Sequence, residues 1–390
     1  MKKWGGNILL FVGATIVSVL TLEFALRLVY PAHESWRLHS IPDPEMGWVL
    51  EPGAAFTRQV MGAFVKVRYN AQGFRDSDFP DIPPDDATRI VVLGDSYMEA
   101  NMVPLEDVLH KQLERMAAAD GRKVKTWNLG VAGYGTLQEY LAFLKTGAAQ
   151  KPDLVLLAFY LHNDVKNNAE HLNTGARAKR KGKRKRPFLD EDEESQWRIL
   201  EPDYEAMQKR FERKNNSLLF RLRHNSVLLS LARNARRALR SDEKAFGSTA
   251  FAMNLCSSAA SYEKAWRTTE RIILRLNDAV ERAGAKLVVF PVPALFDADM
   301  EMVARFQEKL AGSGQEICAE NSPGYARLHQ ILDTGSIDYI DLVPAFRRAV
   351  TQEKQDLFVR GDWHWNGAGH ALAAREVYGA LKSRSLFPDS

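Results

Sequence analysis

The chain has 390 residues, of which 45% are hydrophobic and 26% charged, and its formal net charge is +4. This length suits one large domain with additions or two domains, and the composition is that of an ordinary globular protein. Without one basic run of eight charges and one acidic run of five, the net charge is only +1, so the composition gives no support for a nucleic-acid-binding protein.

The N-terminal segment is first basic and then apolar. Lys2 and Lys3 precede an apolar run over residues 8–22, Glu23 interrupts it, and further apolar residues follow up to position 30. We expect residues 1–30 to form an uncleaved signal-anchor helix, because no Ala-x-Ala cleavage site follows the run. A cleavable signal peptide is the alternative. The two lysines favour an orientation with the catalytic part outside the cytoplasm, which predicts a single-pass protein of the inner membrane.

Residues 31–87 are rich in Pro, Gly and aromatic residues, which predicts a linker followed by a small β-cap. Alternating patterns typical of strands occur at 56–60 and 64–69. Arg75 follows in a Gly-Phe-Arg turn, where we expect it to form a structural ion pair.

From residue 88 onward, strand-like and helix-like segments alternate. Strands are predicted at 90–93, 124–127, 154–161, 286–290 and 337–341, and helices at 105–119, 137–146, 262–283, 302–311 and 367–381. Such alternation is typical of a parallel sheet with helices on both faces. The predicted fold is therefore α/β, with a doubly wound, flavodoxin-like sheet of five strands within residues 88–385.

A long stretch over residues 165–260 interrupts this alternation. Eight of the ten residues at 177–186 are Lys or Arg, and residues 190–194 are all acidic. We expect an insertion that is partly helical and partly disordered, with a mobile charged loop at 174–196. The basic run is most simply a solvated loop that pairs with its acidic neighbour. Contact with anionic lipid headgroups or polysaccharide is the alternative.

The segment Gly94-Asp95-Ser96 directly follows the first predicted strand of the sheet. In α/β sheets, reacting groups collect at the carboxyl ends of strands, where loops and helix N-termini present backbone N–H groups. Ser96 is therefore a candidate nucleophile. A serine that only caps the following helix is the alternative.

Near the C-terminus, Asp362 and His364 provide a carboxylate and an imidazole just before the last predicted helix. A serine hydroxyl becomes nucleophilic when a base takes its proton, and that base needs an acceptor on its other nitrogen. His364 could be this base and Asp362 its acceptor, unless His364 is only a loop histidine packed between Trp363 and Trp365. His370 is the poorer candidate, because it lies within the predicted helix.

Two further segments could supply hydrogen-bond donors. The Gly-rich turn 128–135 follows the second strand and contains Gly133, and Asn163 follows the third strand. Backbone N–H groups and asparagine amides are the donors that an oxyanion hole requires. Either one alone is more typical of an ordinary turn.

Taken together, these four segments resemble those of the SGNH hydrolases, or GDSL-type esterases, which contribute Ser, Gly, Asn and His in this chain order. The resemblance covers roughly residues 88–385 and is to membrane-anchored bacterial members of the family. It implies that Ser96 is the nucleophile of a triad with His364 and Asp362. It also implies an oxyanion hole formed by the N–H groups of Ser96 and Gly133 and the amide of Asn163.

The chain departs from the family pattern at two points. Leu161 and His162 stand where the third block usually has Gly-x, and one residue rather than two separates Asp362 from His364. The shorter spacing also occurs in relatives that O-acetylate polysaccharides. The resemblance implies a serine esterase for an acyl ester, with a cell-envelope glycan favoured over a lipid. An O-acyltransferase with the same triad and an inactive, anchored component of a polysaccharide assembly pathway are the alternatives.

No metal or cofactor site is predicted, because the sequence has no His and carboxylate cluster beyond the triad and no nucleotide-binding glycine pattern. The two cysteines, Cys256 and Cys318, lack the spacing of metal ligands. They form either a disulfide, if the domain lies outside the cytoplasm, or two buried thiols.

Overall fold

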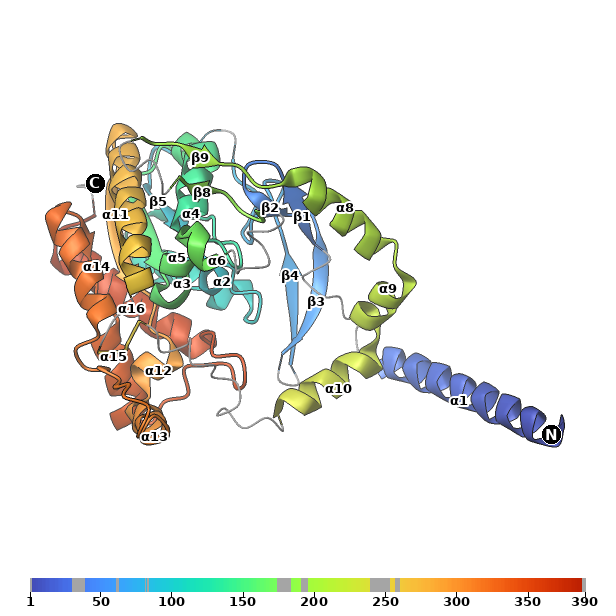
Figure 1. The fold of residues 1–390 in the computed structure, drawn as a ribbon. Helices are drawn as coiled ribbons and strands as arrows, with labels where there is room; N and C mark the ends of the chain where they lie inside the picture. Colours follow the sequence, from blue (N-terminus) through green and yellow to red (C-terminus); the bar gives the residue numbers. More distant parts are fainter. Residues whose placement is uncertain are drawn as a thin grey trace.

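The computed structural model describes residues 2–29, 39–60, 63–80, 82, 84–173, 184–190, 196–238, 253–256 and 260–387. The central element is a five-stranded sheet of β5 (Thr88–Leu93), β6 (Val124–Asn128), β7 (Leu154–Phe159), β10 (Lys286–Pro291) and β11 (Asp338–Tyr339). Its strands are all parallel and lie in the order β11-β10-β7-β5-β6 (Figure 1). This is the flavodoxin-like order, so the predicted doubly wound α/β fold is confirmed.

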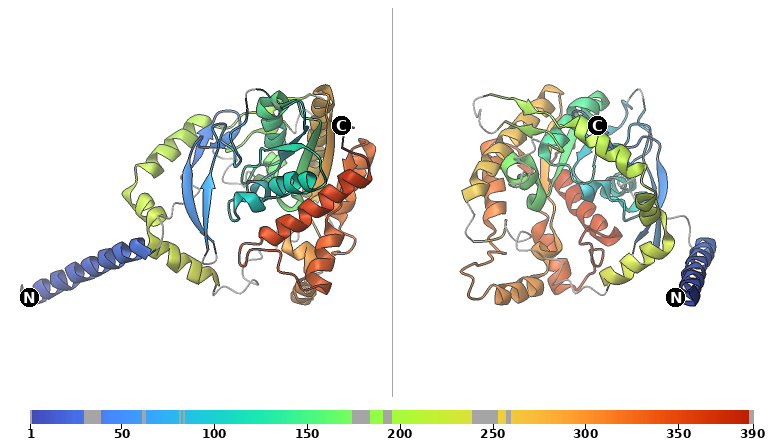
Figure 2. Two further views of the ribbon diagram at one scale, coloured as in Figure 1. Left: turned by 180° about the vertical axis from the view of Figure 1, so that it is seen from behind. Right: turned by 45° about the vertical axis from the view of Figure 1, so that its right-hand side comes forward.

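Helices cover both faces of this sheet (Figures 1 and 2). Alternate residues of β5 point to opposite faces, with Val91 and Leu93 in one hydrophobic core and Ile90 and Val92 in the other. The first core is completed by α4 (Thr136–Ala142), α11 (Ala260–Arg282) and α14 (Pro323–Thr334), and the second by α3 (Leu109–Ala119), α15 (Val343–Arg347) and α16 (Gly367–Ser383). Burial on both faces explains why the strands are continuously apolar.

The ends of some elements differ from the expected ones. The third strand, β7, ends at Phe159, because Leu161 already begins α5 (Leu161–Asn168) and the Asp164 carboxylate accepts the Tyr160 N–H at 2.7 Å. The edge strand β11 has only two residues. Shorter helical segments are α2 (Ser96–Glu99), Leu105–Asp107, Phe143–Gly147, Ala148–Gln150, α6 (Glu170–Asn173), α12 (Leu295–Ala298), α13 (Met300–Lys309) and Arg348–Gln352.

Two antiparallel hairpins precede the sheet domain. The predicted one is formed by β3 (Ala55–Val60) and β4 (Ala63–Arg68), and we call it the cap hairpin. The other, which was not predicted, pairs β1 (Ser40–Asp43) with β2 (Gly47–Leu50). Phe56, Val65 and Val67 are buried and join the core on one face of the sheet, so the cap hairpin is packed against the sheet domain.

Arg75 does not form the ion pair that we expected. Its guanidinium is buried and donates to the backbone carbonyls of Glu99, Ala100 and Val103. Glu99 is the last residue of α2. The last carbonyls of a helix have no N–H donor within that helix, so they need a donor from elsewhere. Arg75 therefore fixes the carboxyl end of the short helix that Ser96 begins.

The N-terminal helix α1 (Lys2–Val29) projects away from the sheet domain (Figure 1). Its segment Gly6–Val29 has a mean hydropathy of 2.2, so it is long and apolar enough to cross a membrane. The insertion contains β8 (Phe188–Leu189), β9 (Ile199–Leu200), α8 (Tyr204–Asn215), α9 (Leu218–Asn225) and α10 (Val227–Ala238). Most of the charged loop predicted at 174–196 lies outside the described residues.

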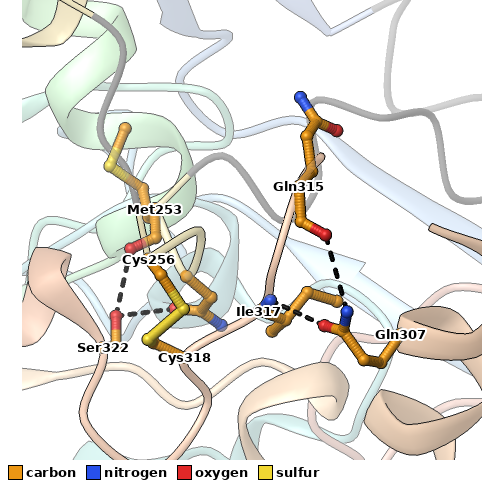
Figure 3. The surroundings of a disulfide bond; sticks show 8 residues. Met253, Cys256, Gln307, Gln315, Ile317, Cys318 and Ser322 are labelled. Carbon is orange, nitrogen blue, oxygen red and sulfur yellow. Dashed lines mark hydrogen bonds between the residues drawn. A yellow bond between two sulfur atoms is a disulfide. The ribbon is translucent and has the colours of Figure 1, made fainter. Parts of the chain in front are cut away.

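Cys256 and Cys318 form a disulfide, which decides between the two alternatives left by the sequence (Figure 3). The bond joins the segment before α11 to the segment before α14. Beside it, the Ser322 hydroxyl donates to the Asn254 side chain at 2.8 Å and to the Met253 carbonyl at 3.0 Å. The disulfide thus fixes two segments that are far apart in the sequence.

Candidate active site

Ser96 is the first residue of α2, immediately beyond the carboxyl end of β5. The helix is capped by Asp95, whose Oδ1 accepts the Tyr97 N–H at 2.9 Å. The capping role proposed as an alternative for Ser96 therefore belongs to its neighbour. Gly94 is needed at this turn, because an added Cβ would lie 2.5 Å from the Met98 side chain.

His364 and Asp362 lie next to Ser96 in space although 268 residues separate the serine from the histidine. His364 Nε2 is 2.8 Å from Ser96 Oγ, and His364 Nδ1 is 2.6 Å from Asp362 Oδ1. With Asp362 accepting the Nδ1 proton, the lone pair of Nε2 faces the serine hydroxyl. The arrangement is able to deprotonate Ser96.

The single residue between Asp362 and His364 adopts an unusual backbone conformation. Trp363 has a φ of +63°, and its N–H and that of Asp362 both donate to the Val359 carbonyl at 3.0 Å. This tight turn brings the carboxylate back to Nδ1 across one intervening residue. The imidazole is also held by the ring of Tyr97, whose centroid lies 4.7 Å from that of His364.

His370 lies elsewhere, inside α16. It is fully buried, and burial together with the positive charge of Arg75 lowers its pKa from the usual 6.5 to about 3. A buried, neutral histidine next to Trp365 is a packing residue rather than a base for Ser96.

Arg58 was not among the site residues predicted from the sequence. Its guanidinium Nη2 lies 3.9 Å from Asp362 Oδ2, the carboxylate oxygen that does not face His364. It occupies the same side of β3 as the buried Phe56, two residues before it, and its own side chain is only 13% exposed. An arginine at an inward position of a predicted strand was the signal that could have identified it.

The Gly-rich turn after β6 packs against the serine helix. The Val131 N–H donates to the Gly94 carbonyl at 3.2 Å, and an added Cβ on Gly130 would lie 2.4 Å from Met98 Cβ. Gly133 has a φ of +80°, a conformation that glycine adopts without strain. Trp48 of β2 closes this turn from outside, and its indole N–H donates to the Ala132 carbonyl at 3.2 Å.

Asn163 lies in the first turn of α5 and reaches the same region from β7, the strand next to β5. Its Nδ2 donates to Asp95 Oδ2 at 2.6 Å. Because an amide nitrogen carries two N–H donors, this bond leaves the second one for another acceptor. The structure therefore connects Asn163 to the residue before Ser96.

The region around Ser96 contains three buried carboxyl groups, those of Asp95, Glu139 and Asp164. Burial raises the pKa of Asp95, although the Tyr97 N–H and Asn163 amide partly offset this effect. Burial also raises the pKa values of Asp164 and Glu139 well above their usual range. No group of His, Cys, Asp and Glu side chains suited to a metal ion occurs in the part of the chain that the structure describes.

Comparison with known protein families identifies the C-terminal part of the chain. Residues 254–390 match the family described as "SGNH hydrolase-like domain, acetyltransferase AlgX". This C-terminal part is therefore SGNH hydrolase-like. The matched range contains Asp362 and His364, whereas Ser96, Gly133 and Asn163 precede it. No match to a curated protein was found.

Several solved structures are similar to this chain. An acetyl xylan esterase, AlAXEase, has 13% identity and a TM-score of 0.41, and 75% of this chain and 99% of that chain are covered. A lipase/acylhydrolase from Enterococcus faecalis has 15% identity and a TM-score of 0.37, covering 76% and 96%. The esterase EstA from Pseudoalteromonas sp. has 10% identity and a TM-score of 0.38, covering 76% and 98%.

The two residues at which the chain departs from the third block of the SGNH hydrolases, Leu161 and His162, have structural partners. Leu161 is buried and packs against Gly324. A Cβ added to Gly324 would lie 3.0 Å from the Leu161 side chain. His162 Nε2 is 3.0 Å from Asp297 Oδ2, which also accepts the Tyr325 hydroxyl at 3.0 Å. Burial alone would raise the pKa of Asp297, but His162 and several hydrogen bonds hold it below its usual range.

Proposed function

We propose that this protein is a serine esterase that cleaves an acyl ester through an acyl-enzyme on Ser96. The observation that carries the proposal is the pair of short contacts from His364, 2.8 Å to Ser96 and 2.6 Å to Asp362. These contacts are within the range expected of a nucleophile, its base and the acceptor that orients the base.

In the first step, Ser96 Oγ forms a bond to the ester carbonyl carbon while His364 Nε2 takes the serine proton. The carbonyl oxygen becomes an oxyanion, which we assign to the N–H groups of Ser96 and Gly133 and the second amide hydrogen of Asn163. The intermediate then expels the alcohol, which receives the proton from His364. Ser96 is left as an acyl ester.

In the second step, a hydroxyl group replaces the alcohol. His364 takes a proton from water, the resulting oxygen attacks the acyl carbon, and the Ser96 Oγ–acyl bond breaks. The carboxylic acid leaves, and Ser96 regains its proton from His364. If the attacking group is a sugar hydroxyl instead, the same steps transfer the acyl group to that sugar.

Acyl transfer is therefore the second candidate function. The description of the matching family as an acetyltransferase favours it, as does the Asp-x-His spacing at Asp362 and His364. For both functions we propose an O-acyl group on a cell-envelope glycan as the substrate, and we propose residues 88–385 as the domain that carries the reaction.

We further propose that α1, within residues 1–30, anchors this domain to the outer face of the inner membrane, with residues 31–87 as linker and cap. The apolar character of α1 and the Cys256–Cys318 disulfide support this location, since disulfides persist in oxidising compartments. A reporter that is active only outside the cytoplasm, fused after Ser390, should be active. Activity of a cytoplasmic reporter at the same place would contradict this topology.

The test of the proposed nucleophile combines labelling with kinetics. A serine-directed phosphonate should add to Ser96 in the purified protein, as located by peptide mass spectrometry. Ser96→Ala should lower p-nitrophenyl acetate hydrolysis by at least about 10³-fold. Ser313→Ala, at an exposed position, is the matched control and should keep full activity. An unlabelled but folded protein, or an active Ser96→Ala variant, would contradict the proposal.

Hydrolysis and transfer are separated by their products. The enzyme is incubated with an acetylated sugar, with and without a second glycan that bears free hydroxyl groups. Acetate release that is unaffected by the second glycan supports the esterase. Acetylation of the second glycan at the expense of free acetate supports the transferase.

A further inference from the structure

The helices α8, α9 and α10 form an extension, here called the helical arm, which curves around the outside of the cap hairpin (Figures 1 and 2). The start of its last helix, α10, lies beside the C-terminal part of α1, and the two helices pack against each other. The contacts of the arm with α1 have no role in the proposed esterase chemistry or in the packing of the five-stranded sheet.

The junction between the arm and α1 is a specific polar contact. The Glu23 carboxylate of α1 accepts hydrogen bonds from the Ser226 hydroxyl at 2.8 Å and from the N–H groups of Val227 and Leu228, both at 3.0 Å. These N–H groups begin α10 and have no acceptor within their own helix. Glu23 therefore binds the start of α10 and fixes it at one level along α1.

That level coincides with the end of the apolar run in α1. Residues 8–22 extend over about 22 Å as a helix, which is shorter than the hydrocarbon core of a bilayer at about 30 Å. Glu23 follows this run directly, and Arg27 pairs with it at 2.8 Å. If α1 crosses the membrane, Glu23 and the start of α10 lie at the boundary between acyl chains and headgroups.

The arm exposes large apolar side chains close to this boundary. On α9, Leu218, Leu219 and Leu222 are 70%, 80% and 54% exposed, and on α10 Leu229 is 44% exposed. Leu222 lies four positions after Leu218 and three after Leu219, so it is a neighbour of both on the helix surface. A contiguous apolar face of this kind is typical of a surface that contacts a membrane or a partner.

The arm also has a basic cavity. A cavity of about 960 Å³ lies between the arm and the strand β1, with Trp48 and Phe220 in its walls. Its basic lining residues are Arg184, Lys185, Lys209, Arg210, Arg213 and Lys214. Among the described residues, its acidic lining is limited to Asp203 and Glu205. This excess of positive charge beside apolar side chains fits an amphipathic anionic ligand.

We propose that the helical arm binds the membrane surface beside α1, with the leucines of α9 among the acyl chains and the basic cavity facing the phosphates of anionic phospholipids. The proposal rests on the membrane anchor proposed above. Anionic phospholipid is favoured over an acidic glycan because the leucines, the basic cavity and the end of the apolar helix lie along one arm. A glycan would leave the leucines in water.

The test measures the depth of single fluorescent labels in the full-length protein. Leu219→Cys is labelled with an environment-sensitive dye, since the disulfide leaves no other free thiol among the described cysteines. The protein is reconstituted into nanodiscs of phosphatidylcholine, alone or mixed with phosphatidylglycerol, and lipids with a nitroxide on the acyl chain act as quenchers. Leu144→Cys, 47% exposed on the sheet domain, is the matched control.

We expect the dye at Leu219 to be quenched roughly threefold more than the dye at Leu144, and more strongly with phosphatidylglycerol than without it. Arg210→Glu with Arg213→Glu should remove the effect of phosphatidylglycerol. Equal quenching at Leu219 and Leu144 would overturn the proposal. A dye response to polygalacturonate but not to phosphatidylglycerol would overturn it in favour of a glycan site.

A second label distinguishes failure of the proposed membrane anchor from failure of the proposed membrane contact of the arm. Ile16→Cys lies in the middle of α1, and its dye reports whether that helix is in the membrane. Quenching at Ile16 without quenching at Leu219 refutes the arm alone, whereas no quenching at Ile16 refutes the anchor. Phosphonate labelling of Ser96 in the same samples tests the catalytic proposal independently of both.

Discussion

Asn163 donates a hydrogen bond of 2.6 Å to Asp95, the residue immediately before Ser96. The other oxygen of the same carboxylate accepts the Tyr97 N–H at 2.9 Å, so Asp95 connects the end of β7 with the helix that Ser96 begins. The strand before Ser96 is β5, and β5 and β7 are neighbours at the point where the strand order of the sheet reverses. A single buried carboxylate thus links the proposed nucleophile to a proposed oxyanion donor.

We predict that Asp95→Asn preserves the fold but lowers kcat/KM for p-nitrophenyl acetate by about 10²-fold, as does the loss of one oxyanion donor. Tyr97 and Asn163 bind different oxygens of the Asp95 carboxylate, and the new amide keeps an acceptor oxygen at only one of these two places. Asn163→Ala should have a similar effect, and the double variant should be little worse than either single one. Additive losses would show that Asp95 does not act through Asn163.

Arg58 is predicted to support the Asp362 carboxylate from the cap hairpin. Arg58→Gln should lower kcat by about two- to fivefold, the size expected from a partly exposed charge pair, while KM changes less. Arg58→Lys should restore part of the rate. Arg68→Gln is the control, because Arg68 lies on the same hairpin but pairs with the exposed Asp78 at 3.1 Å. Equal losses in the Arg58 and Arg68 variants would indicate a general effect on the hairpin.

Glu139 provides a test of stability against pH. Its carboxyl is buried and its pKa is raised, so the folded state resists losing the proton that the unfolded state loses near its ordinary pKa of 4.5. Folding stability from this group is complete at low pH and decreases as pH rises above that value.

Glu139→Gln should therefore stabilise the protein at pH 8 by on the order of 1–3 kcal/mol and by much less at pH 4.5. Thermal unfolding followed by circular dichroism at both pH values measures this difference. Glu308→Gln, at an exposed position, should change neither midpoint. A stabilisation of Glu139→Gln that is the same at both pH values would refute the role of the ionisation.

The disulfide is predicted to contribute substantially to stability. Replacing Cys256 and Cys318 together by serine removes a crosslink between residues 62 positions apart and should cost about 2–5 kcal/mol. Urea unfolding should show the same loss in wild-type protein treated with a reductant. If the reductant has no effect on the unfolding midpoint, the bond does not contribute in solution.

The sequence was sufficient for the sheet, because each strand is a short apolar run between charged or glycine residues, and alternation of strands and helices predicts a parallel order. Strand ends were less accurate. The third strand stops at Phe159, where α5 follows and the Asp164 side chain binds the Tyr160 N–H, and hydrophobic patterning does not reveal a side-chain contact of this kind.

The sequence indicated candidate site residues where the proposed chemistry calls for particular residue types, as at Ser96, Asn163 and His364. It did not indicate the contacts around them. Asp95 looked like one residue of a turn, although it binds Asn163, and Arg58 looked like a polar residue in a cap strand. Their partners lie 68 and 304 positions away, a separation over which no local pattern carries information.

The distance along the chain between Ser96 and His364 also has a consequence for biosynthesis. The two residues are 268 positions apart, and at roughly 5–20 residues per second the ribosome needs on the order of 10 to 50 s to pass from one to the other. During that time the emerging chain already carries its serine but not its base. In the proposed mechanism, chains that terminate before His364 lack the base, so the activity should arise only after His364 has been added.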